Sequence, residues 1–465
     1  MPGTRNPFPT MWPSVALGKG KPPSAELRSA RAVRTEQLSG LGKLAFASLW
    51  LLVFAIPWED AITISGFGTS SRLIGMVALG LGALALFERG RIRRPSTGHV
   101  IMALFVGVAA ASYSWSLFPE GTLLQVVTYL QLFMMVWLIW EFAVRPQEQM
   151  RLMQAYVLGT FVSGIDTVIQ FLWHKESDYQ RYAGAGLNAN DLGLIMALSI
   201  PISYYLLIRA RGQMAWVYGL QLVLAGTTII LTASRGAALS GLVALTIIPL
   251  THAGLTGRQK IAAVIALALI TTGVMIFAPT TSWDRLSTTP HEFSRGTLTG
   301  RTLIWTAGWE LFREHPYLGV GANAFRLTVS RVLEEPIRMG NPKSPAPPAH
   351  NTFLSVLVEQ GAIGFLIFVA LLGALVLSLA NMSALSRKLW IVSLAVWAVG
   401  VSSLTWEMRK PTWFLFGLLL AQGVSTTQKI PWFRARKPNL PNYNHQPAFH
   451  GPDDFLPARE SRSRV

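Results

Sequence analysis

The chain has no cysteine and little charge. The absence of Cys among its 465 residues excludes a disulfide, a thiolate nucleophile and a cysteine-ligated metal site. Charged residues make up 14% of the chain, whereas soluble proteins carry roughly 25%. Hydrophobic residues make up 51%, more than a soluble core of this length requires. The composition therefore predicts one membrane domain instead of about three soluble ones.

Apolar segments recur from residue 41 to residue 426. A helix needs about 20 apolar residues to cross roughly 30 Å of hydrocarbon, and somewhat fewer where flanking side chains reach the interface. We predict an all-α polytopic membrane protein with about twelve transmembrane helices. They are expected at about 41–58, 71–87, 98–117, 122–143, 151–173, 191–208, 214–232, 236–252, 260–278, 362–380, 388–405 and 413–426.

Acidic residues are also scarce, and 40 Lys and Arg against 23 Asp and Glu give a net charge of +17. Basic residues between membrane spans hold loops on the cytoplasmic side, and with the N-terminus inside about two thirds of them lie there. Because the charges follow the topology instead of forming one patch, nucleic-acid binding is disfavoured. We expect an inner-membrane protein with a disordered basic cytoplasmic arm (1–40), a membrane domain (41–426) and a basic cytoplasmic tail (427–465).

This topology places the polar chemistry on the periplasmic face. Three polar segments lie there: 174–190, the turn 234–236 and a large, partly helical loop at about 279–361. In that loop, 301–314 reads as an amphipathic helix ended by a proline and a glycine. We expect its apolar side to lie on the membrane surface through Ile304, Trp305, Trp309, Leu311 and Phe312.

His350 follows a segment with four prolines (341–349), which predicts a stiff extended strap. Asn351 can cap the next helix, and Gly361 interrupts it. A histidine at the first turn of a helix feels the positive end of the helix dipole, which keeps a neutral base available. The alternative is a half-exposed interfacial histidine without a catalytic role.

Three arginines on the same face could bind an anion. Arg235 lies in a turn with almost no water-exposed loop, where a guanidinium needs an anion or carbonyl groups, and a lipid-linked diphosphate is a suitable anion. A topological anchor or a lipid-phosphate contact is the alternative, although an anchor is expected on the inside. Arg301 and Arg181 are each either solvated surface charges or, with Arg235, parts of a cationic pocket for pyrophosphate.

Other polar features have less specific interpretations. Asp166 is an intramembrane carboxylate, which indicates function, but a helix-end or water-facing position explains it equally well. The turn 319–321, Gly-Val-Gly, is predicted to be structural because no strand precedes it. His174, His291 and His315 have no metal-ligand spacing with His350, so we predict no metal and no cofactor.

Four ordered sequence blocks resemble the O-antigen ligase and Wzy-type O-antigen polymerase superfamily. They cover about residues 180–380. One departure is Ala189, where many relatives have proline. The blocks are Arg181-Tyr-Ala-Gly with Asn188-Ala-Asn190-Asp191; Thr-Ala-Ser234-Arg235-Gly236; Gly300-Arg301 to Trp305 with Pro316 to Gly319-Val-Gly321; and His350-Asn351-Thr-Phe-Leu to Glu359-Gln-Gly361.

The resemblance implies a membrane glycosyltransferase of GT-C-like fold. It would transfer a glycan from undecaprenyl diphosphate to an acceptor sugar hydroxyl, such as lipid A core or another glycan, in O-antigen, exopolysaccharide or capsule biosynthesis, without metal or nucleotide. The resemblance makes His350 the general base and assigns the diphosphate to Arg235 and Arg301, helped by Arg181. Asn190, Asn351 and Glu359 would support them.

Two alternatives stay open at this stage. A transporter or flippase for polyprenyl-linked glycans would show charged residues near the midplane of several spans and internal symmetry between halves. The sequence shows chiefly Asp166 and no evident repeat. Within the transferase interpretation, ligase, polymerase and protein O-glycosyltransferase differ in their acceptor, which the residues do not identify.

Overall fold

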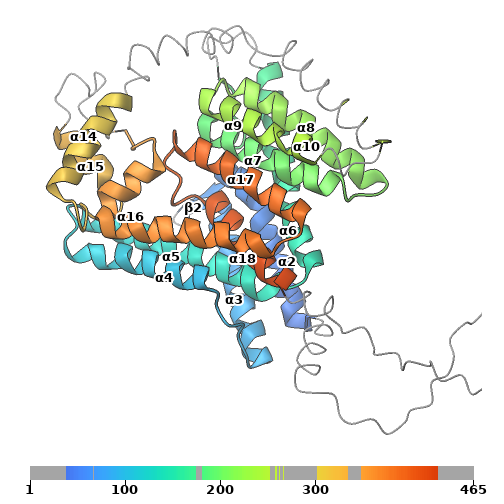
Figure 1. The fold of residues 1–465 in the computed structure, drawn as a ribbon, viewed down its shortest axis with the longest axis horizontal. Helices are drawn as coiled ribbons and strands as arrows, with labels where there is room; N and C mark the ends of the chain where they lie inside the picture. Colours follow the sequence, from blue (N-terminus) through green and yellow to red (C-terminus); the bar gives the residue numbers. More distant parts are fainter. Residues whose placement is uncertain are drawn as a thin grey trace, which may run out of the picture.

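The computed structural model describes residues 38–65, 68–173, 181–251, 301–332 and 347–427, with a few residues between 257 and 265 (Figure 1). The predicted ninth span at 260–278, the arm, the tail and most of the proline-rich strap lie outside these ranges. The described chain is almost entirely helical, with one antiparallel pair of two-residue strands, Thr63–Ile64 and Gly68–Thr69.

The elements follow the chain in one order. They are α2 (Gly40–Ala55), η1 (Ile56–Ala61), β1 (Thr63–Ile64), β2 (Gly68–Thr69), α3 (Ser70–Arg89), α4 (Thr97–Ala111), η2 (Ser112–Ser114), α5 (Pro119–Phe142), α6 (Pro146–Trp173), α7 (Ala189–Leu207), α8 (Gln213–Leu231), α9 (Arg235–Leu245), α10 (Ile247–Thr251), α14 (Arg301–Glu314), α15 (Phe325–Val332), α16 (Thr352–Ser378), η6 (Leu379–Asn381), α17 (Ala384–Val401) and α18 (Lys410–Thr427).

Within the described ranges, nine helices are long and apolar enough to cross a membrane. The shorter apolar segment Arg235–Thr251 and helix α18 coincide with two further predicted spans. The all-α polytopic membrane fold is therefore confirmed. The total of about twelve spans and the GT-C-like arrangement stay predictions.

Side-chain caps explain where several helices begin. An N-cap oxygen accepts a hydrogen bond from a backbone N–H of the first turn, which satisfies a group that has no partner within the helix. Asn351 caps α16 in this way, as predicted, by accepting from the Leu354 N–H at 3.1 Å. The other side-chain caps are Ser39 of α2, Asn188 of α7, Ser234 of α9 and Ser383 of α17.

Helices α7 and α18 form the centre of the bundle. Helix α7 packs against α6, α8, α9 and α17, and almost all of its side chains are buried. Helix α18 packs against α5 and α16 and buries an aromatic and leucine-rich stretch, Trp413–Ala421. A helix that is apolar all round belongs in the interior, so both patterns agree with their positions.

Helices α14 and α15 form a separate apolar cluster over the first half of α16 (Figure 1). The predicted helix 301–314 is confirmed, but its predicted contact with the membrane surface is wrong for Ile304 and Leu311. Both are buried in this cluster, with Phe325 and Val358. Among the five side chains predicted to lie on the membrane surface, only Trp309, at 46% exposure, is exposed. The helix thus uses its apolar side to fold the loop against α16.

The Gly-Val-Gly turn fastens the same loop to a kink in α16. Gly361 has φ 63° and interrupts the helix, as the sequence predicts. The N–H of Val320 donates to the Val358 carbonyl at 3.0 Å, and that of Gly321 to the Glu359 carbonyl at 2.9 Å. A Cβ on Gly319 would lie 2.5 Å from backbone atoms of Glu359. The turn therefore has the predicted structural role, and glycine is required by close backbone packing.

Candidate active site

A cavity of about 960 Å³ opens where several helices begin or end. Its inner wall is apolar and comes from α2, α3 and α5, including Leu52, Met76, Leu79 and Leu132. Its polar wall comes from η1, the loop before α7, the start of α7, the start of α15, residues 350–359 and the segment before α18. Those polar residues include Asp60, Arg181, Asn190, Asp191, Arg326, His350, Glu359 and Arg409. We call this side of the bundle the His350 end.

His350 lines the cavity in a constrained backbone conformation. Its φ is 49°, a left-handed value uncommon for a side chain with a Cβ. Its N–H donates to Thr405 Oγ1 at 3.0 Å, and the carbonyl of Ala349 accepts from Trp305 Nε1 at 2.9 Å. Hydrogen bonds to both polar groups of the Ala349–His350 peptide therefore hold the backbone in this strained conformation.

The electrostatics keep His350 neutral. Burial, and then repulsion from Arg301, lowers the pKa of His350 to about 4, while Asp191 opposes the shift and Arg326 adds to it. Near neutral pH the ring therefore has one nitrogen available as a hydrogen-bond acceptor, as a general base requires. The sequence predicts this neutral state from the helix dipole, whereas the resolved causes are burial and neighbouring cations.

Arg301 and Arg235 lie near each other at the starts of α14 and α9. Burial lowers the pKa of Arg301, and repulsion from Arg235 lowers it further. Neither residue is among those that line the cavity, but the charge of Arg301 acts on His350, which does. The predicted trio of two arginines and one histidine is thus brought together in space, although the chain separates its members by 49 residues or more.

Arg181 and Asn190 have a different geometry. Arg181 lines the cavity and donates from Nε to the Thr232 carbonyl at 3.0 Å and from Nη2 to Asn190 Oδ1 at 2.7 Å. Ser234, the cap of α9, also donates to Asn190 Oδ1, at 2.9 Å. These bonds tie the 181–190 loop to the turn that carries Arg235, so both residues position it.

Two further sequence features have structural explanations. Asp166 accepts from the Ala185 N–H at 2.6 Å and from Gln170 Nε2 at 3.1 Å, and therefore holds the loop before α7. Ala189, which departs from the family pattern, is the first residue of α7 after its cap Asn188. Proline is well accepted at that position, so alanine keeps the same helix start.

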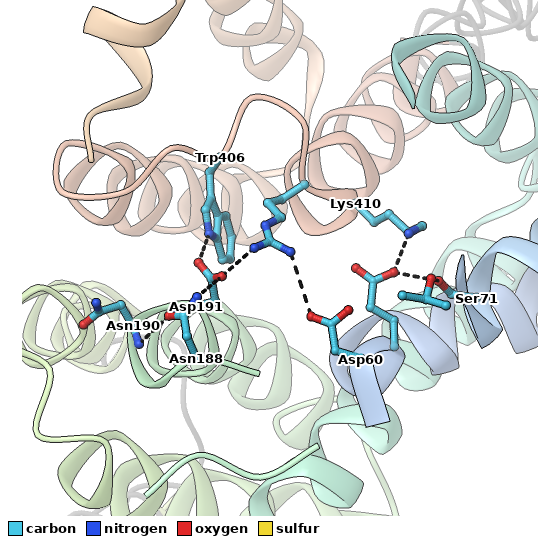
Figure 2. A network of polar contacts seen from close by, with 10 residues as sticks. Asp60, Ser71, Asn188, Asn190, Asp191, Trp406 and Lys410 are labelled. Carbon is cyan, nitrogen blue, oxygen red and sulfur yellow. Dashed lines mark hydrogen bonds and ion pairs between the residues drawn. The ribbon is translucent and has the colours of Figure 1, made fainter. Parts of the chain in front are cut away.

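Sequence reasoning missed an ionic network across the cavity (Figure 2). Asp191 accepts from Trp406 Nε1 at 2.7 Å and from Arg409 at 2.8 Å, while a second nitrogen of Arg409 lies 4.0 Å from Asp60. Lys410 pairs with Glu59, which also accepts from Ser71 at 2.6 Å. The network joins the end of α2, the start of α7 and the segment before α18.

A signal for this network exists in the sequence. The pairs Glu59-Asp60 and Arg409-Lys410 each lie at the edge of an apolar span, on the side predicted to be periplasmic. Opposite charges at the edges of two distant spans are a reason to expect pairing. The sequence does not show that these two pairs meet, because they are more than 340 residues apart.

The fold and the cavity together define a class, a multi-span membrane protein with a cationic and carboxylate-rich site at one end of its helices. Within the described ranges, no group of three or more His, Cys, Asp or Glu could hold a metal ion. No curated protein matches the chain at a significant level.

Residues 220–369 match the family model described as O-antigen ligase. This match confirms the predicted resemblance and supports, in general terms, a membrane glycosyltransferase of the O-antigen ligase or polymerase type. The matched segment contains Arg235, Arg301, His350 and Glu359. Arg181 and the residues around Arg409 lie outside it.

Proposed function

We propose that the protein transfers a glycan from a polyprenyl diphosphate, undecaprenyl diphosphate in bacteria, to a hydroxyl of an acceptor sugar at the periplasmic face. Envelope polysaccharide biosynthesis, as O-antigen, exopolysaccharide or capsule, is the corresponding process. The observation that carries the proposal is the neutral His350 on the cavity wall with Arg301 and Arg235 close by.

His350 is the proposed general base. As the acceptor oxygen attacks the anomeric carbon of the donor, it must lose its proton, and a neutral imidazole can take it. His350 precedes the α16 cap, and its backbone N–H is bonded to Thr405. The ring can therefore be oriented before the acceptor binds.

Arg235 and Arg301 are the proposed binding groups for the diphosphate. The leaving group gains negative charge when the anomeric C–O bond breaks, and fixed cations stabilise it. Two partly buried arginines close to each other repel, and a dianion bound between them removes that repulsion.

The apolar wall of the cavity suits the lipid part of this donor. Leu52 on α2, Met76 and Leu79 on α3, and Leu132 on α5 line the same cavity as His350. A polyprenyl chain can bury apolar surface there while its diphosphate stays at the polar wall. One site can thus hold the lipid and present its head group to the base.

Transfer in liposomes with a polyprenyl diphosphate-linked glycan and an acceptor glycan tests the proposal. His350→Ala and Arg235→Ala are expected to lower the rate by about 10²-fold or more while the protein stays folded. His315→Ala and Arg313→Ala, exposed residues at the end of α14, are the matched controls and should retain activity. Wild-type rates in both test variants would refute the proposal, and movement of the carrier without a glycosidic product would indicate a transporter.

Sidedness needs its own measurement. Because the chain has no cysteine, single-cysteine variants can be labelled without removing native thiols. An impermeant thiol reagent should label Glu314→Cys from the periplasm and Ile92→Cys only after the membrane is opened, since both positions are exposed. The reverse pattern would place the site in the cytoplasm.

A further inference from the structure

A buried polar cluster lies against the cavity and is not used by the proposed chemistry. It consists of Glu359 and Gln360 on α16, Glu407 before α18, and Gln125 and Tyr129 on α5. All five side chains are at most 4% exposed. The charges of Glu359 and Glu407 interact with each other, and both act on the Tyr129 hydroxyl. Two carboxyl groups therefore share one interior space.

Several atoms of this cluster have no hydrogen-bond partner in the described part of the chain. Glu407 Oε2 is one of them, and the amide atoms of Gln360, Gln125 Nε2 and the Tyr129 hydroxyl have no contact of full hydrogen-bond geometry, although both amides lie close enough to act on the hydroxyl. Buried polar atoms are normally satisfied, so these atoms indicate an occupant. The set includes both donors and acceptors. A cation would satisfy the acceptors alone, whereas water satisfies both kinds.

Each of the two carboxyl groups accepts a hydrogen bond at its Oε1 atom. Glu407 Oε1 accepts from Ser355 at 2.8 Å. The backbone carbonyl of Glu407 accepts from the Trp413 ring N–H at 2.7 Å. Glu359 Oε1 accepts from the Phe325 N–H at 3.3 Å. Glu359 and Ser355 also line the cavity that His350 lines. The cluster is thus continuous with the site.

We propose that Glu359, Glu407 and enclosed water form a proton-binding site that takes up the proton released from the acceptor hydroxyl. This inference rests on the proposed function. The acceptor O–H proton goes to His350, and the acceptor oxygen forms the new bond to the anomeric carbon. The anomeric bond to the diphosphate oxygen breaks and leaves its electron pair on that oxygen. His350 then releases its proton to the carboxylate pair, which returns the imidazole to its neutral form.

The titration of Glu407 suits this role. Burial raises the pKa of Glu407 to about 7, so the carboxyl can exchange a proton near neutral pH. The titratable groups that the structure places against it are Glu359 on α16 and Tyr129 on α5, while Arg326 on α15 lines the neighbouring cavity. Only the ionised carboxylate can accept a proton, so transfer should speed up as the pH rises through about 7.

Infrared spectroscopy tests the protonated site without using activity. The wild-type protein in nanodiscs should show the carbonyl band of a protonated carboxyl group at pH 6, and the band should fade as the pH rises above 7. Glu407→Gln should remove it, whereas Glu120→Gln, an exposed residue at the start of α5, should not. Absence of the band in the wild type would overturn the proposal even if glycan transfer is intact.

The pH profile of transfer tests the relay. Glu407→Gln should lower the rate at pH 8 by about tenfold and make it independent of pH between 6 and 8, and Glu407→Asp should partly restore both. A Glu407→Gln enzyme with the wild-type rate and profile would overturn the relay. Failure of the proposed function is distinct, since it would leave the infrared band in place and remove the effect of His350→Ala.

Discussion

The two ends of the helix bundle use arginine in opposite ways. We call the other end, which carries Arg89, Arg93, Arg145 and their partners, the Arg89 end. There Arg89 pairs with the fully buried Glu141, whose other oxygen accepts from the Arg93 N–H at 2.8 Å. Arg145 donates to Glu148 at 2.7 Å. At the His350 end, Arg301 faces Arg235, and His350 faces Arg301 and Arg326.

The two ends differ in what lies next to their cations, which is a carboxylate at one end and also another cation at the other. At the Arg89 end the chain supplies its own carboxylates from α5 and α6, so the charges are neutralised within the fold. At the His350 end Arg409 and Lys410 also pair with carboxylates, and in addition Arg235 and Arg301 repel each other near a cavity of about 960 Å³. Like charges gathered at a cavity favour an anionic ligand, whereas paired charges favour stability and topology.

The largest expected effect is on catalysis, at Arg301. Replacing one preorganised group that stabilises developing charge costs about 10²–10³ in rate. Arg301→Gln should therefore lower glycan transfer by that factor without lowering the melting temperature, because removing a cation relieves repulsion with Arg235. Transfer kinetics and thermal unfolding in detergent measure the two quantities, with Arg313→Gln on the same helix as control. A large loss of stability would show that Arg301 is structural.

An arginine-to-glutamine change at the Arg89 end should lower stability and leave catalysis unchanged. Arg89→Gln leaves the buried carboxylate of Glu141 without its guanidinium, and removal of one partner of a buried pair costs roughly 3 kcal/mol. The free energy of unfolding should fall while transfer by the folded fraction is unchanged. The double variant Arg89→Gln with Glu141→Gln should recover much of the loss. A transfer defect without loss of stability would contradict the distinction between the two ends.

An intermediate effect concerns the protonation of His350. Its pKa of about 4 lies below the ordinary value of 6.5, so the folded protein binds a proton less readily than the unfolded chain. Its contribution to stability is complete above about pH 6.5 and is lost as the pH falls through about 4. Arg301→Gln removes a repelling charge and should raise the pKa of His350. NMR of histidine-labelled protein, with His350→Gln for assignment, measures it, and an unchanged pKa would show that burial alone sets it.

Sequence patterns predicted the parts of this molecule that depend on local chemistry. The length of the apolar segments predicted the helices. The proline and glycine after residue 314 predicted the end of α14, and Asn351 predicted the cap of α16. The motif residues Arg235, Arg301 and His350 were predicted to share one site because the predicted topology places them on one face. Each of these inferences needs only nearby residues or the side of the membrane.

Long-range pairing could not be predicted in the same way. Asp191 meets Arg409 across 218 residues, and Glu407 lies near Glu359 only because α16 is kinked and packed beside α18. Periodicity does not identify the surface that the apolar side of α14 covers, and the predicted membrane surface is wrong for Ile304 and Leu311. Ile304 and Leu311 would suit lipid or protein equally well, and only the position of α15 and α16 decides for protein.

The smallest expected effect is at Arg145, and it sharpens the comparison between paired arginines. Its side chain is 44% exposed and pairs with Glu148 three residues later, an arrangement that contributes little because water competes for the guanidinium. Arg145→Gln should change the free energy of unfolding by less than about 0.5 kcal/mol, since Glu148 still accepts from the backbone N–H of residue 145 at 2.8 Å. Unfolding of this variant beside Arg89→Gln would then show that burial of the guanidinium, 24% exposed in Arg89 and 44% in Arg145, and not pairing as such, makes the Arg89 end stable. An equal loss in both variants would mean that pairing itself stabilises this end.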